Sequence, residues 1–188
     1  MFLKIKIIII FLFILSCQPI ELVTPISIDN SRLEKISINA KEIILNIKYN
    51  PVFSKNNIED QIKNPPLKII TNWNNQNIEN FGNQNKLIIN IIEASISKTE
   101  VDNIGAEKYE EKTIFKYEVF FLVEYELYDD SDYLLANTTV ESSRSTTSQK
   151  YISLNETEVI INNLLNQSLK DFVSETNEQI KLYMGEFL

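Results

Sequence analysis

Few side chains in this sequence are able to do chemistry. Cys17 is the only cysteine in the 188 residues, and there is no histidine. The chain therefore lacks the base of Ser-His and Cys-His catalysis and a ligand that zinc and haem sites usually need. The three glycines, Gly82, Gly105 and Gly185, lie too far apart for a glycine-rich phosphate loop. We therefore expect no catalytic residues, no metal site and no cofactor, and we expect that the protein is not an enzyme.

The segment in front of Cys17 has the three parts of a secretory signal. Lys4 and Lys6 give a basic start, Ile7–Leu15 is apolar, and the small residue Ser16 precedes the expected cut. The apolar run is much shorter than the roughly 20 residues that span a bilayer, which argues against an uncleaved membrane helix. We predict that residues 1–16 are a signal peptide.

The end of this segment, Ile14-Leu15-Ser16-Cys17, resembles the lipobox of bacterial lipoproteins. The resemblance implies that Cys17 carries a diacylglycerol and an amide-linked acyl chain, more than the two signals that stable anchoring requires. A thiol used in this way cannot form a disulfide within the mature chain. The alternative is a soluble secreted protein in which Cys17 is incidental.

The residue after the cysteine bears on location. Gln18 stands where enterobacterial lipoproteins retained in the inner membrane have an aspartate. We therefore expect a lipid anchor in the outer membrane with the protein on the periplasmic face. The inner membrane is the alternative location.

Two groups of carboxylates are weak candidates for a site. Asp129, Asp130 and Asp132 could hold calcium, but the central glycine and the distant glutamate of an EF-hand loop are missing, so a solvated turn is favoured. The second group lies in a polar segment that reads as a mobile loop between two strands. Its members are Glu107, Glu110 and Glu111.

Arg144 is a weak candidate for contact with a partner. It lies in the polar run Ser142–Thr147. Its guanidinium fork could bind a carboxylate or phosphate of a partner. The alternative is an exposed charge at the end of a strand.

Charge and length limit the class of protein. The chain has 18 basic and 26 acidic residues, and loss of Lys4 and Lys6 with the signal takes the net charge from −8 to −10. This acidity disfavours nucleic acid as a partner. About 170 mature residues suffice for one domain with a real core. We expect residues 17–34 to form a lipidated tether and residues 35–188 a single domain.

Hydrophobic periodicity predicts the elements of that domain. Apolar residues alternate from Ile36 to Tyr49, and again over 86–99, 115–128 and 133–145, which predicts four strands. In the second, Ile88, Ile92, Ala94 and Ile96 are assigned to one face and Leu87, Ile89 and Ile91 to the other.

Two helices complete the prediction. The first starts at Asn64-Pro65-Pro66, passes through Trp73 in the core, includes Ile78 and Phe81, and stops at Gly82. The second follows a capping box, Ser153 to Glu156. Its apolar stripe contains Ile161, Leu165, Leu169, Phe172, Thr176, Ile180, Tyr183 and Phe187. We predict an α+β fold, order β-α-β-β-β-α, with a four-stranded, mostly antiparallel sheet and both helices on one face.

These blocks resemble an uncharacterised lipoprotein family of alphaproteobacteria. The matching stretches are Ile43–Pro51, Asn57-Ile58-Glu59, Asn64-Pro65-Pro66, Trp73, Glu93–Ile96, Ser143–Thr146 and Leu182–Leu188. The family has no assigned activity, so the resemblance implies location and architecture only. In element order the chain is more distantly similar to the LPS-assembly lipoprotein LptE and to auxiliary lipoproteins of lipid-transporting ABC systems.

Two functions fit these features. The first is a non-enzymatic, membrane-anchored accessory or structural subunit in envelope assembly or lipid transport, with a membrane-protein partner. The alternative is a periplasmic binding module for a lipid or another apolar ligand.

Overall fold

The computed structural model describes residues 33–188 except residue 53. The predicted signal peptide, Cys17 and all but the last two residues of the predicted tether lie outside the described residues. The elements in chain order are β1 (Ile36–Ile38), β2 (Glu42–Ile47), η2 (Glu59–Gln61), α2 (Pro66–Asn77), β3 (Ile78–Asn80), β4 (Lys86–Asp102), β5 (Thr113–Tyr128), β6 (Leu134–Ser148), α3 (Leu154–Met184) and η3 (Gly185–Phe187).

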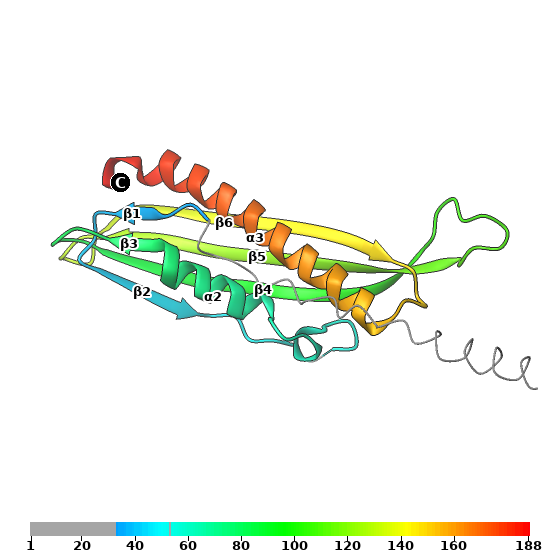
Figure 1. Cartoon of the computed structure of the whole chain (residues 1–188). Helices are drawn as coiled ribbons and strands as arrows, with labels where there is room; N and C mark the ends of the chain where they lie inside the picture. The colour runs from blue at the N-terminus through cyan, green and yellow to red at the C-terminus, as the bar shows by residue number, and fades with distance from the viewer. Residues whose placement is uncertain (1–32, 53) are drawn as a thin grey trace, which may run out of the picture.

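Four strands form a mixed sheet in the order β2-β4-β5-β6, in which β2 is parallel to β4 and the other pairs are antiparallel. The helices α2 and α3 lie over one face of this sheet (Figure 1). The predicted α+β fold is therefore confirmed. The sequence did not predict a second, two-stranded sheet of β1 and β3.

Alternating residues of β5 form the centre of the core. The side chains of Tyr117, Val119, Phe121, Val123, Tyr125 and Leu127 are all 1% exposed or less. Phe172 of α3 contacts both Phe121 and Trp73, with ring centroids 5.5 and 5.7 Å apart. Trp73 is fully buried, as predicted. This aromatic cluster fills the space between helices and sheet.

The predicted faces of β4 are wrong because the strand contains a β-bulge. Ile91 is opposite Val123, but Glu93 is opposite Leu122, so Ile92 is an extra residue. A bulge inserts one residue and reverses the inward and outward alternation beyond it. The buried set is therefore Leu87, Ile89, Ile91, Ala94 and Ile96.

The first helix is shorter than predicted. It ends at Asn77, and Ile78–Asn80 form β3, which pairs in parallel with β1. Ile78 gains a buried place in this pairing, whereas Phe81 stays exposed. Gly82 does not stop a helix: an added Cβ would lie 2.1 Å from the movable Asn39 Oδ1 atom and 3.0 Å from the Ala40 backbone nitrogen, so the close approach of the two segments favours glycine.

The long helix α3 begins as predicted. The Ser153 hydroxyl accepts from the Glu156 amide, and the Glu156 carboxylate accepts from the Ser153 amide. The predicted stripe is buried through Ile180, but Tyr183 is exposed and Met184 takes its place in the core. Neither α3 nor any other helix among the described residues combines the length and apolarity needed to cross a membrane.

Candidate functional site

A cleft of about 540 Å³ opens beneath the N-terminal end of α3. That end of α3 lies toward the end of the sheet at which the loop between β4 and β5 projects (Figure 1). The walls of the cleft are formed by β4 and β5, on the face of the sheet that the helices cover, by the segment around η2, and by the first turns of α3. The lining residues are Ile58, Gln61, Ile62, Lys63, Lys98, Tyr117, Lys150, Ile152, Leu154, Thr157, Glu158, Ile161 and Asn162. A cleft of this volume suits a small ligand.

Three lysines line this cleft in an otherwise acidic chain. The Lys150 ammonium pairs with the Glu100 carboxylate, and this contact lowers the pKa of Glu100. The Lys98 ammonium lies 3.8 Å from the centre of the Phe115 ring and has no carboxylate partner among the described residues. Lys63 likewise has no ion-pair partner in the described part of the chain. Glu158 is the single acidic residue in the lining, so the cleft is locally cationic.

Two largely buried residues in the lining have polar atoms without a hydrogen-bond partner within residues 33–188, residue 53 aside. Tyr117 is 1% exposed and Asn162 is 9% exposed. Neither the Tyr117 hydroxyl nor the Asn162 amide makes a hydrogen bond with a described residue. The fully buried unpaired atoms of the described residues are Thr71 Oγ1, Trp73 Nε1 and Ser168 Oγ, so the polar tips of Tyr117 and Asn162 reach the surface of the cleft. They are therefore free to hydrogen-bond a ligand there.

The wall opposite α3 is held in place by a buried carboxylate. Glu59 is 7% exposed and accepts hydrogen bonds from the Tyr49 hydroxyl at 2.5 Å and from the Asn57 side-chain amide at 3.0 Å. Burial is the main cause of a raised pKa of the Tyr49 hydroxyl, and the hydrogen bond to the Glu59 carboxylate is the second. The neighbouring Ile58 amide donates to the Ile96 carbonyl of β4 at 3.3 Å. This network fixes the segment before η2 against the sheet.

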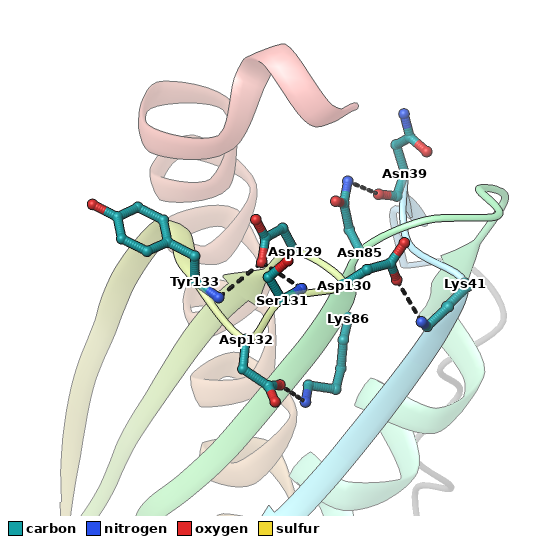
Figure 2. Close-up of polar contacts among 9 residues, drawn as sticks. All are labelled: Asn39, Lys41, Asn85, Lys86, Asp129, Asp130, Ser131, Asp132 and Tyr133. Atoms are coloured by element: carbon teal, nitrogen blue, oxygen red, sulfur yellow. Dashed lines mark hydrogen bonds and ion pairs between the residues drawn. The ribbon is translucent and has the colours of Figure 1, made fainter.

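The acidic turn between β5 and β6 is satisfied internally. The Asp129 carboxylate accepts from the amides of Ser131 and Tyr133, each at 2.8 Å, as Figure 2 shows. The Asp130 carboxylate pairs with Lys41, and Asp132 pairs with Lys86 at 2.7 Å (Figure 2). The Lys86 contact lowers the pKa of Asp132. With backbone amides as the partners of Asp129 and lysines as those of Asp130 and Asp132, these carboxylates form a capped turn. No group of residues suited to a metal ion occurs in the described chain.

The three glutamates of the loop between β4 and β5 do not converge. Glu110 accepts from the Glu107 amide at 3.0 Å, within the loop. Glu111 accepts from the Lys150 amide at 2.8 Å, which ties the loop to the segment before α3. These hydrogen bonds stabilise the conformation of the loop.

Arg144 lies within β6, opposite Val119, and not at the end of a strand. Its guanidinium donates to the Asp171 carboxylate of α3 at 2.7 Å and to the Gln167 side-chain oxygen at 3.3 Å. The side chain therefore joins β6 to α3, and its predicted contact with a partner stays a prediction.

The outer edge of β6 is open. In the described residues, no backbone group hydrogen-bonds to β6 from the side away from β5. The strand contains no proline and no lysine, and Glu141 and Arg144 are its only charged residues. Proline, lysine and bulges are the usual means by which a free edge avoids pairing. A bulge at Leu135 lies near the start of the strand, so the edge from Ala136 to Ser148 is the part with few such safeguards.

Comparisons with known proteins give only distant likenesses. No family model and no curated protein matches the chain. The structure is similar to a minor lipoprotein from Acinetobacter baumannii at 13% identity, with a TM-score of 0.42, over 77% of this chain and 93% of that one. It is also similar to a neuraminyllactose-binding hemagglutinin homolog from Helicobacter pylori at 9% identity, with a TM-score of 0.37, over 76% and 88% of the two chains. One of these neighbours is itself a lipoprotein, but likenesses at this level carry no argument. The family resemblances stay predictions.

Sequence reasoning did not find the cleft. Its unpaired polar groups, Tyr117 and Asn162, look like an ordinary strand residue and an ordinary helix residue. The available signal was Lys98, a charged residue that continues the alternation of the buried residues Ala94 and Ile96 on β4. A charge there also suits an exposed strand end, so this signal alone does not identify a cleft.

Proposed function

We propose that this chain is a non-enzymatic, lipid-anchored envelope protein that acts as an accessory or structural subunit in envelope assembly or lipid transport. The anchor is proposed from the lipobox-like segment that ends at Cys17, on the periplasmic face of the outer membrane. The observation that supports action by contact is the open edge of β6. A partner strand that adds to this edge gains main-chain hydrogen bonds without any change in the fold.

The proposed partner is a membrane protein of the envelope that presents an extended strand to β6. The test places a photoreactive amino acid at Thr139, an exposed residue of β6, in the full chain in its native envelope. We expect one membrane protein to be cross-linked and recovered in constant ratio. Gln76, exposed on α2, is the control position. Ser143→Lys adds a charge to the edge and should reduce cross-linking from Thr139. Recovery of the protein alone, or equal products from Gln76, would contradict the proposal.

The anchor has its own test. Labelling with radioactive palmitate should mark the wild-type chain and not Cys17→Ala. Equal labelling of the two chains would exclude lipidation at Cys17.

A second candidate function is a periplasmic binding module. The space between helices and sheet is filled by Trp73, Phe121 and Phe172, so a ligand enclosed there has no support. The observation that favours this candidate is the cleft beneath α3, with its unpaired polar groups.

A further inference from the structure

We infer that the cleft beneath α3 binds an amphiphile with a single apolar chain and an anionic head, either a carboxylate or a phosphate. This inference rests on the second candidate function and gives its ligand a chemical class. It does not depend on a partner at β6.

The cationic groups favour an anionic head. Lys98 and Lys63 have no carboxylate partner among the described residues, although the chain has a net charge of −8. The Phe115 ring holds the Lys98 ammonium, 3.8 Å above its centre, beside the cleft. A cation–π contact with a phenyl ring is weak, and a charge-assisted hydrogen bond to an anion would be a stronger interaction for this ammonium.

The unpaired polar groups add directed hydrogen bonds. The Tyr117 hydroxyl and the Asn162 side-chain amide can both donate, and both residues are at least nine-tenths buried. The end of α3 is not the donor, because Ser153 and Glu156 already cap it. An oxyanion in the cleft would therefore be bound by side chains from β4, β5 and α3.

Apolar side chains favour a hydrocarbon chain attached to that head. Ile58, Ile62, Ile152 and Ile161 line the cleft, and Leu154 stands at its rim with 90% of its side chain exposed. An exposed leucine at a cleft mouth can cover a chain that extends outward. The volume of about 540 Å³ is within the range of small-molecule sites, about 300–1,000 Å³, which favours one acyl chain over a two-chain lipid.

The test uses the full chain reconstituted in phosphatidylcholine nanodiscs. A long-chain fatty acid that carries a diazirine is added and irradiated, and labelled peptides are mapped by mass spectrometry. We expect labels in the peptides around 58–63 and 152–162. Laurate and dodecyl phosphate should compete, whereas dodecyltrimethylammonium, acetate and inorganic phosphate should not. The relative potency of the first two probes shows whether the cleft prefers a carboxylate or a phosphate head, and the last two separate a whole amphiphile from a free anion.

Variants link the labelling to the proposed groups. Lys98→Gln should reduce labelling roughly tenfold, whereas Lys181→Gln, which removes the same charge from an exposed site on α3, should leave it unchanged. Tyr117→Phe should weaken binding severalfold without loss of folding stability, because its hydroxyl has no partner in the free protein. Equal labelling of Lys98→Gln and Lys181→Gln, labels confined to other peptides, or competition by inorganic phosphate alone would each overturn the inference. If cross-linking at β6 fails while these results hold, only the first proposed function is lost.

Discussion

The hydrogen bond between Tyr49 and Glu59 gives a prediction that tests how the cleft wall is held. Tyr49→Phe removes the hydroxyl that donates to the buried Glu59 carboxylate at 2.5 Å. Glu59 then keeps only the Asn57 side-chain amide at 3.0 Å as a side-chain donor. A hydrogen bond to a charged group contributes about 1.5–3 kcal/mol, and its loss leaves the carboxylate under-solvated. Because Tyr49 is itself half-buried, we expect the free energy of unfolding to fall by about 2 kcal/mol.

Urea unfolding followed by circular dichroism measures this loss. In a domain of this size, 1 kcal/mol corresponds to roughly 2–4 °C in Tm, so the melting temperature should fall by roughly 4–8 °C. The m-value should not change, because the same surface is exposed on unfolding. A matched control is Tyr133→Phe, which removes a hydroxyl from a side chain that is exposed at the turn between β5 and β6. A loss of less than 0.5 kcal/mol, close to that of the control, would refute the account of Glu59 as a buried anchor.

The pH dependence of the same contact has a definite sign. The pKa of Tyr49 is raised in the folded state by burial and by Glu59. A group whose pKa is raised in the folded state contributes its full stabilisation below the pKa of the unfolded state, about 10 for tyrosine. That contribution is lost as the pH rises from this value toward the raised folded pKa. The wild type should therefore lose more stability between about pH 10 and 11 than Tyr49→Phe does. Parallel losses in the two proteins would contradict this assignment.

Three further predictions concern other parts of the fold. Phe172→Ala should cost about 3–5 kcal/mol in urea unfolding, because it opens a cavity between Trp73 and Phe121; a loss under 1 kcal/mol would contradict tight packing there. Ser153→Ala removes the N-cap of α3 and should lower the free energy of unfolding by about 1 kcal/mol. An unchanged value would mean that this helix end is frayed and the cap is not formed. Asp132→Asn should destabilise the fold slightly at neutral pH and progressively less as acid protonates the wild-type carboxylate, whose pKa is lowered by Lys86; a difference that grows in acid would refute the pairing.

The sequence predicted the elements whose pattern is local. The alternation from Phe115 to Leu127 and the capping box at Ser153 each depend on neighbours in the chain, and both are confirmed. The failures involve partners distant in sequence. Ile78 continues a helical spacing, but it pairs with Ile36, 42 residues earlier, and tertiary pairing overrides the local pattern. The bulge at Ile92 is likewise a property of two strands together.

The cleft illustrates the same limit for function. Lys98, Tyr117 and Asn162 come from three elements, and each is unremarkable within its own segment. They become informative only because the fold leaves their polar atoms unpaired beside one another. A polar group left free at a cleft surface cannot be identified from sequence, since the sequence does not show which hydrogen bonds are already made.

The two proposed surfaces lie on different parts of the sheet, which makes their tests independent. The Lys98 side chain belongs to the helix-covered face of β4, whereas Ser143 is an exposed residue of β6, with β5 between the two strands. Neighbouring strands are about 4.8 Å apart, and Lys98 is in register through Tyr117 with Thr146, three residues from Ser143. The two positions are therefore more than roughly 10 Å apart, a distance at which substitutions usually act additively. Lys98→Gln should therefore leave cross-linking from Thr139 unchanged, and Ser143→Lys should leave fatty-acid labelling unchanged. If either variant impaired both readouts with folding intact, the ligand and the partner would have to be coupled through β5.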